Sequence, residues 1–249
     1  MGDVEQTEPS VQTDASAQAE GGGVILTDMQ GHEVRVEQVK RAISLTPAGT
    51  EIICALGGEA LLVGIDAFSN YPEGTKEIEI VGDYNGPDVE KVVALEPDVI
   101  FAGNTLQQDA IDQLESLGMT VVCIEATGWE EVPVSIALVG EVLDAQQEAE
   151  AVIGELEAAE KAAQEAAPKE KPTVYYAVSF GDSGNWTSGP GSFINTMIEI
   201  AGGSCVTEDA ADSWVEFPIE DLVVADPDII LLDNSMGSTG DLATVPGYQ

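Results

Sequence analysis

Two stretches of the chain repeat the same pattern of residues at a constant separation. The first runs from Tyr84 to Ile100 and the second from Trp214 to Ile230, so each matched position lies 130 residues further on. Each copy has an aromatic residue, a glutamate six positions later, a short apolar run and an acid-Pro-Asp turn that leads into β-branched residues. This separation is too long for a solenoid, whose repeats span about 20–50 residues. We therefore expect two similar lobes, each carrying one copy.

The segments before each copy alternate between strand and helix patterns. A short strand at 42–45 precedes a helix that opens at Thr46-Pro47 and ends at Gly57-Gly58, and a second strand follows at 61–65. A strand at 173–178, a loop of small residues and a helix ending at Gly202-Gly203 repeat this order. Strand, helix and strand in succession favour a parallel sheet. The predicted fold class is α/β, with two Rossmann-like lobes built on parallel sheets.

Strong helix formers fill the segment between the two lobes. Residues 130–143 have a helical pattern, and Asp144 with Gln147 resembles a capping box that starts a second helix over 146–167. At about 1.5 Å per residue, that second helix would extend roughly 33 Å. It is either a stiff connection between the lobes or an ordinary surface helix.

These patterns divide the chain into four parts. Only 19 residues follow Ile230, and they are rich in Gly, Ser and Thr, whereas the first lobe continues with a helix and a strand. We therefore expect the second lobe to be truncated. The expected parts are a disordered acidic linker at 1–23, an N-terminal α/β lobe at 24–126, connecting helices at 127–171 and an incomplete C-terminal α/β lobe at 172–249.

Charge and composition exclude several classes of protein. The chain has 46 acidic and 8 basic residues, a net charge of −38. Such a surface repels nucleic acid, which proteins bind through Lys and Arg. No apolar run is long enough to span a bilayer, and no signal peptide is visible at the start.

Catalytic and metal-binding patterns are also missing from the sequence. The single histidine, His32, lies in an expected hairpin at 24–36, and no phosphate-binding loop or zinc-protease motif occurs. The three cysteines are scattered, and Cys54 and Cys123 lie in apolar runs typical of core positions. We therefore expect no enzyme activity, no metal site and no cofactor.

Six motifs follow one another along the chain: VILTDMQGHEVRV at 24–36, ISLTPAGTE at 43–51, FSNYP at 68–72, DVEKVVALEPDVI at 88–100, WTSGPGSF at 186–193 and FPIEDLVVADPDIILL at 217–232. In this order they resemble a known family, the substrate-binding proteins of bacterial ABC importers for vitamin B12, ferric siderophores and haem. The resemblance is strongest to the vitamin B12-binding members, through SNYP, the aromatic residue before Asn85-Gly86, and Trp214.

The resemblance implies two α/β lobes joined by one long helix, with ligand bound in the cleft between them. In open α/β sheets the loops at the carboxyl ends of the strands hold the ligand, which agrees with this implication. Any one of the aromatic residues could instead pack inside its lobe. The expected ligand-binding residues are Pro47, Ala48, Gly49, Tyr71, Tyr84, Asn85, Gly86, Trp186 and Trp214.

The resemblance also assigns a role to one glutamate in each repeat copy. Glu90 and Glu220 match the two glutamates that dock onto arginines of the membrane permease in this family. Carboxylate–Arg pairs are strong and directional. The alternative is that each glutamate only interacts favourably with the dipole of its own helix, because both lie in a first turn.

The distribution of basic residues bears on the ligand. None of the eight Lys and Arg residues falls in an expected cleft loop. Burying an anionic chelate without a cation is costly, and haem would need cations for its propionates beside a ligand such as Tyr71 or Tyr84. A corrinoid similar to vitamin B12 is therefore expected, with a ferric siderophore or haem as alternatives. A surface adhesion protein, with no small ligand, is a third possibility.

The expected partners and location follow from the resemblance alone. They are an ABC permease dimer with its ATPase subunits, and an extracytoplasmic, periplasmic or cell-surface lipoprotein location. The protein would be a monomer, with its acidic tail as a tether and its lipoprotein leader absent from this sequence.

Overall fold

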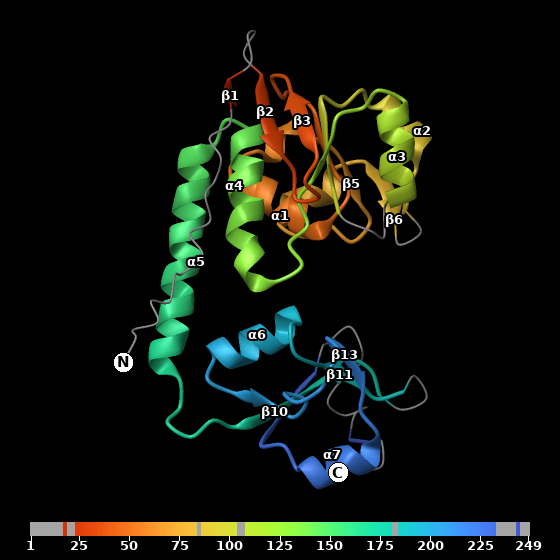
Figure 1. The fold of residues 1–249 in the computed structure, drawn as a ribbon. Helices are drawn as coiled ribbons and strands as arrows, with labels where there is room; N and C mark the ends of the chain where they lie inside the picture. The colour runs from red at the N-terminus through yellow and green to blue at the C-terminus, as the bar shows by residue number, and fades with distance from the viewer. Residues whose placement is uncertain are drawn as a thin grey trace, which may run out of the picture. The chain divides into compact units, whose positions relative to one another are not determined.

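The computed structural model describes residues 17–18, 23–83, 86–103, 108–180, 184–232 and 243–244. The chain divides into two compact units, Met1–Glu125 with Leu138–Ala145, and Ala126–Ala137 with Gln146–Gln249. Each unit has its own parallel sheet and its own helices (Figure 1), so the expected two-lobed α/β fold is confirmed.

The first unit is organised around a six-stranded sheet of order β7-β6-β5-β4-β8-β9, in which only β7 is antiparallel to its neighbour. The chain runs outward from β4 through β5 and β6, then returns to the other side of β4 for β8 and β9. The strands are β4 (Ala42–Ser44), β5 (Leu62–Asp66), β6 (Ile80–Asp83), β7 (Gly86–Pro87), β8 (Val99–Ala102) and β9 (Val121–Cys123). The strand order therefore reverses between β4 and β8.

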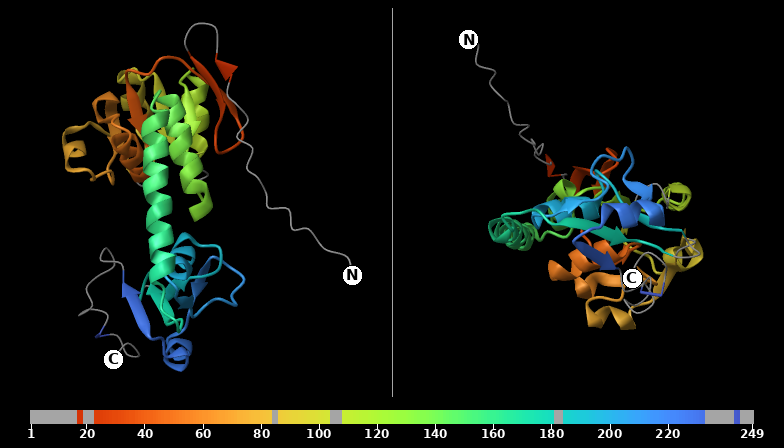
Figure 2. Two further views of the ribbon diagram at one scale, coloured as in Figure 1. Left: turned by 90° about the vertical axis from the view of Figure 1, so that its left-hand side faces the viewer. Right: turned by 90° about the horizontal axis from the view of Figure 1, so that it is seen from below.

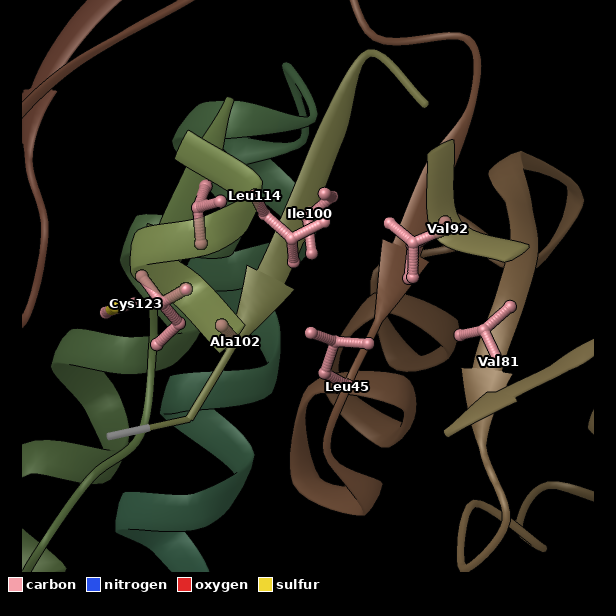
Figure 3. Packing of buried hydrophobic residues seen from close by; sticks show 10 residues of the cluster. Leu45, Val81, Val92, Ile100, Ala102, Leu114 and Cys123 are labelled. Carbon is pink, nitrogen blue, oxygen red and sulfur yellow. The ribbon is translucent and has the colours of Figure 1, made fainter. Parts of the chain in front are cut away.

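Helices of the first unit cover this sheet. They are α1 (Pro47–Ala55), α2 (Val89–Ala94), α3 (Gln108–Ser116) and the 3₁₀ turns η1 (Glu59–Leu61) and η2 (Glu73–Glu77). One core cluster contains Val92 of α2, Leu114 of α3 and the buried side chains of β4, β6, β8 and β9 (Figure 3). Because every residue of β8 is buried, this inner strand is apolar on both faces, as in parallel sheets generally.

The expected N-terminal hairpin is confirmed. Strands β2 (Val24–Thr27) and β3 (Glu33–Val36) pair antiparallel. The short strand β1 (Ala17–Gln18) pairs with β2, so these two residues depart from the expectation of a disordered linker over 1–23. Such pairing satisfies backbone groups that a free linker would leave to water.

The second unit repeats this plan on a smaller sheet, of order β12-β10-β14 in the described residues. Alternate residues of β10 face opposite sides: Val174 packs with α6, and Tyr175 packs with α7. The two helices accordingly cover opposite faces of the sheet (Figures 1 and 2). The elements are β10 (Thr173–Ala177), β11 (Trp186–Ser188), α6 (Phe193–Ile200), β12 (Ser204–Cys205), β13 (Trp214–Glu216), α7 (Ile219–Ala225) and β14 (Ile229–Leu232).

The helices between the two sheets in sequence are η4 (Trp129–Glu131), α4 (Val132–Val142) and α5 (Gln146–Ala166). The long helix is thus confirmed, but the capping box is wrong. Asp144 has a positive φ of 57°, whereas an N-cap residue is extended. Asp144 therefore belongs to the turn that ends α4. Of the helices in the described ranges, none combines the length and the apolar character that crossing a bilayer requires.

The two repeat copies form equivalent turns. Asp98 accepts hydrogen bonds from the backbone N–H of Lys40 (2.7 Å) and Arg41 (2.8 Å), just before β4. Asp228 accepts from the backbone N–H (2.8 Å) and hydroxyl (3.0 Å) of Thr173, at the start of β10. Each aspartate therefore fastens its own strand to the central strand of its sheet, so the acid-Pro-Asp turns have a structural role.

Candidate functional site

The carboxyl ends of β4, β5 and β6 lie at one edge of the first sheet, because these strands are parallel. In open α/β sheets, ligands bind at this edge, where the strand order reverses. The loop after β4 leads into α1 at this position, and Pro47 and Ala48 are exposed there. The loops after β5 and β6 lie next to it along the edge.

Gly49 has a packing role in this loop. It is buried, and a Cβ atom here would come within 2.8 Å of the Ser44 hydroxyl and 2.9 Å of Ile124 Cδ1. Its backbone N–H donates to the side chain of Thr46, the N-cap of α1, at 3.1 Å. Gly49 thus allows α1 to begin close against the sheet, which accounts for a glycine at this position.

The loop after β5 carries the most exposed aromatic residues among those of the first unit that the structure describes. Tyr71 is 65% exposed, and Phe68, which the sequence interpretation missed, is 56% exposed. Phe68 belongs to the same FSNYP motif and follows the same strand end. Its position in that loop was the signal that could have identified it.

The expected residues after β6 are only partly described. Tyr84 and Asn85 lie outside the described residues. Gly86 is described and has a φ of 113°, a conformation that favours glycine, at the start of β7. Gly86 pairs with Asp83 in the register of β6 and β7.

The second unit presents two tryptophans on one antiparallel ribbon. In the β11–β13 register Trp186 lies opposite Glu216, and Ser188 lies opposite Trp214. The two tryptophans are therefore diagonal neighbours on the same face of the ribbon, a placement that sets Cα atoms about 7–8 Å apart. Trp186 is 40% exposed and Trp214 is 52% exposed.

The third tryptophan of the chain, Trp129, has structural partners instead. Its ring packs edge-on against Phe193, with 5.7 Å between centroids, and its indole N–H donates to Glu160 at 2.9 Å. Contacts of this kind hold η4 and α5 to α6 within the second unit. Trp129 is therefore fastened by packing, whereas Trp186 and Trp214 leave a large part of their rings free for a ligand.

Glu90 and Glu220 lie in equivalent first turns, of α2 and α7 respectively, and both are exposed. Each helix begins at the same place in its unit, directly before the repeat turn. Asp88 caps α2 by accepting from the backbone N–H of Lys91 at 3.2 Å, so the Glu90 carboxylate is not needed for that purpose. The N-cap of α7 is Pro218, which makes no side-chain hydrogen bond to the helix, so this argument applies to Glu90 and not to Glu220.

The eight basic residues all lie in the described part of the chain, and none is in the loops that hold the candidate residues. Several are committed to local contacts. Arg41 donates to the carbonyl of Leu95 at 2.6 Å, and Lys91 donates to the carbonyl of Ile80 at 3.2 Å. The candidate loops therefore offer aromatic surface without a compensating positive charge.

The described residues contain no group of three or more His, Cys, Asp or Glu side chains placed to hold a metal ion. Burial raises the pKa of the Cys123 thiol to about 12, and the nearby Asp28 carboxylate contributes. Burial likewise raises the pKa of Cys54, although this residue is half-buried and not fully in the core as expected. Neither thiol is a thiolate near neutral pH, so neither is activated as a nucleophile.

A separate apolar cavity of about 280 Å³ lies in the second unit, beside α6. None of the expected ligand-binding residues lines it. It is lined by Pro172, Val174, Tyr176, Ile194, Met197, Ile198, Ala201, Gly203, Ile229 and Leu231. Of the described residues that line it, Tyr176 alone has a polar side chain, so the cavity offers few groups that could orient a ligand.

Comparisons with known proteins agree with this architecture. The chain is 32% identical over 234 residues to the uncharacterized ABC transporter substrate-binding lipoprotein YvrC of Bacillus subtilis, covering 90% of this chain and 74% of that protein. It is 30% identical over 215 residues to the vitamin B12-binding protein of Salmonella paratyphi A, covering 84% and 76%.

Structural comparison supports the same fold. The crystal structure of the periplasmic haem-binding protein HutB of Vibrio cholerae matches with a TM-score of 0.76 at 22% identity, covering 84% of each chain. At this identity the similarity establishes the fold alone. Residues 43–245 match the family described as periplasmic binding protein. The chain therefore belongs to the periplasmic binding protein family.

Proposed function

We propose that this protein is the substrate-binding component of an ABC importer and that its ligand is a corrinoid. The observation that carries the proposal is the exposure of Tyr71, Trp186 and Trp214 in and beside loops that follow parallel strands. Aromatic rings offer wide apolar contact with a polar edge, which suits a large flat ligand.

Charge supports a corrinoid over the alternatives. A ferric catecholate or carboxylate would bring negative charge to loops that already lie in a chain of net charge −38 and contain no Lys or Arg. Haem could take the Tyr71 phenol as an iron ligand, but its propionates would have no cation. A corrinoid has amide groups at its edge, so it needs neither a cation nor an iron ligand from the protein. The relatives named as vitamin B12-binding proteins support the same ligand.

The proposed partner is an ABC permease with its ATPase subunits. Glu90 and Glu220 would each meet a permease arginine, since carboxylate–guanidinium pairs give direction and register. The protein would act outside the cytoplasm as a monomer, and a lipoprotein anchor like that named for the Bacillus subtilis relative would hold it at the membrane. It would deliver the ligand without chemical change, so we propose no enzymatic reaction.

A calorimetric titration of the full chain with cyanocobalamin, cobinamide, haem and a neutral ferric siderophore tests the ligand. We expect one corrinoid bound per chain, and weaker or no binding of the other two ligands. Leu117→Ala is a suitable control variant, because Leu117 is exposed but follows α3 and precedes β9, at the amino edge of the sheet. Tight binding of haem or siderophore without corrinoid binding would assign an alternative ligand, and binding of none would refute the proposal.

A further inference from the structure

The two partly exposed tryptophans of the second unit lie on a ribbon of only two short strands. β11 and β13 pair with each other and, among the described residues, with no strand of the β12-β10-β14 sheet (Figure 1). A two-stranded ribbon is only marginally stable in water by itself. Other contacts must therefore hold the ribbon in place, and with it Trp186 and Trp214.

One of these contacts is a buried polar link at Ser188, the last residue of β11. The carbonyl of Ser188 accepts hydrogen bonds from the hydroxyl of Thr207 and from the thiol of Cys205, whose sulfur lies 3.5 Å away. Ser188 is fully buried, and Cys205 and Thr207 are 3% and 4% exposed. Because a thiol is a weak donor, the Thr207 hydroxyl makes the main bond of this link.

Thr207 is carried by backbone that the main sheet fixes. Cys205 ends β12 and lies opposite Val174 of β10 in the parallel register. The N–H of Val206, the next residue, donates to the carbonyl of Val174 at 3.0 Å. Thr207 follows directly, so its hydroxyl joins the ribbon to the strand at the centre of the sheet.

A second link holds the other end of β11, but it involves only backbone groups. The N–H of Val178, which follows β10, donates to the carbonyl of Trp186 at 2.9 Å. The link at Ser188 depends on a side chain instead, so a substitution at Thr207 can remove it. With the Trp186 link intact, removal of the Thr207 hydroxyl should loosen the ribbon without detaching it.

The position of Ser188 bears on both tryptophans. Ser188 is two residues from Trp186 on β11 and lies opposite Trp214 in the register of the ribbon. The N–H of Gly189, the residue after it, donates at 2.9 Å to the carbonyl of Ser213, the residue before Trp214. A shift of Ser188 therefore moves backbone next to each of the two rings.

Loss of the Thr207 hydroxyl would leave the Ser188 carbonyl, among the described contacts, with the weak thiol donor. A poorly paired carbonyl is costly in the interior, so this end of the ribbon would move toward water. A binding surface that is fixed in advance avoids the loss of conformational entropy on binding. A looser ribbon would therefore bind a ligand less tightly.

We propose that Thr207 is a positioning residue, whose hydroxyl holds the β11–β13 ribbon and its two tryptophans against the main sheet of the second unit. Because Thr207 is buried, it acts through Trp186 and Trp214 and not by touching a ligand. The effect on ligand affinity rests on the proposed function, whereas the positioning role belongs to the unliganded protein.

The positioning role is tested in the unliganded full chain by Thr207→Val, which removes the hydroxyl at nearly constant volume, and by Thr207→Ser, which keeps it. Thr196→Val is the matched control. The Thr196 hydroxyl also bonds to a carbonyl, that of Ser192 at 3.3 Å, but this carbonyl accepts from the Thr196 N–H at 3.1 Å as well.

We expect Thr207→Val to accelerate amide hydrogen exchange at residues 186–189 and 213–216 while exchange in β10 stays as slow as in the wild type. Thr207→Ser and Thr196→Val should exchange as the wild type does. Unchanged exchange in the ribbon, or equal acceleration in β10, would overturn the positioning role. If Thr207→Val does not fold, Thr207→Ala removes the same bond with a smaller side chain and is judged by the same comparison.

The consequence for the ligand is tested by calorimetric titration with cyanocobalamin. Thr207→Val should raise the Kd by about two- to tenfold, the equivalent of one hydrogen bond, and Thr207→Ser should restore the wild-type Kd. A wild-type Kd in Thr207→Val would overturn the role of Thr207 in binding. If the wild type binds none of the tested ligands, the proposed function fails, whereas hydrogen exchange still decides the positioning role.

Discussion

Replacing Trp214 by alanine is expected to weaken corrinoid binding substantially. The residue is 52% exposed. For an aromatic residue that can bury about 200 Å², this leaves about 100 Å² for a ligand to cover, or about 2.5 kcal/mol at roughly 25 cal/mol per Å². Full coverage would correspond to a loss of about 70-fold in affinity, and half coverage to about tenfold. We therefore expect Trp214→Ala to raise the Kd for cyanocobalamin by about 10- to 70-fold.

Isothermal titration calorimetry of the folded variant measures this change. Leu117→Ala is the matched control, because Leu117 is 53% exposed but lies at the amino edge of the first sheet. Its Kd should equal that of the wild type. Trp214→Phe should retain most of the affinity, since it keeps an apolar ring. A wild-type Kd in Trp214→Ala would refute the assignment of this tryptophan to the ligand.

Three other outcomes follow from the charges. Combined Glu90→Lys and Glu220→Lys substitution should abolish transport in a reconstituted importer and leave the corrinoid Kd within about twofold; a lost affinity would contradict the docking role. Hydrogen bonds from the N–H and hydroxyl of Thr173 lower the pKa of Asp228. These bonds therefore stabilise the fold at pH values above the unfolded pKa of about 4, and this stability is lost as pH falls through the lower folded pKa. Because Asp228→Asn has no carboxylate at this position, its Tm should fall less than that of the wild type between pH 5 and pH 3. A net charge of −38 predicts that KCl raises Tm, because about 1 M salt shortens the screening length to about 3 Å; a Tm independent of KCl between 0.1 and 1 M would contradict that.

The two-lobed architecture could be predicted because local signals and the long repeat agreed with each other. Gly57 and Gly202 end equivalent helices with positive φ angles of 78° and 85°. The acid-Pro-Asp turns could also be recognised as turns, and Asp98 and Asp228 in them bond to Arg41 and Thr173 at the beginning of the central strands. A residue pattern that specifies a turn acts within a few positions, so sequence alone can identify it.

The parts that could not be predicted depend on contacts between distant residues. Asp144 has the residue type of an N-cap, but its φ of 57° places it in the turn after α4. The sequence places Phe68 in a loop, but its exposure depends on the bonds among Asp66, Ser69 and Thr50, which belong to separate elements. Nothing in the spacing of these residues indicates that their side chains meet.

A crystal structure of the full chain with bound cyanocobalamin tests the central claim most directly. The account predicts one corrinoid per chain, with the corrin ring in van der Waals contact with Tyr71 or with Trp214 and with no Lys or Arg at its edge. A corrinoid that leaves both of these aromatic residues uncovered, for example one seated at the apolar cavity beside α6, would contradict it.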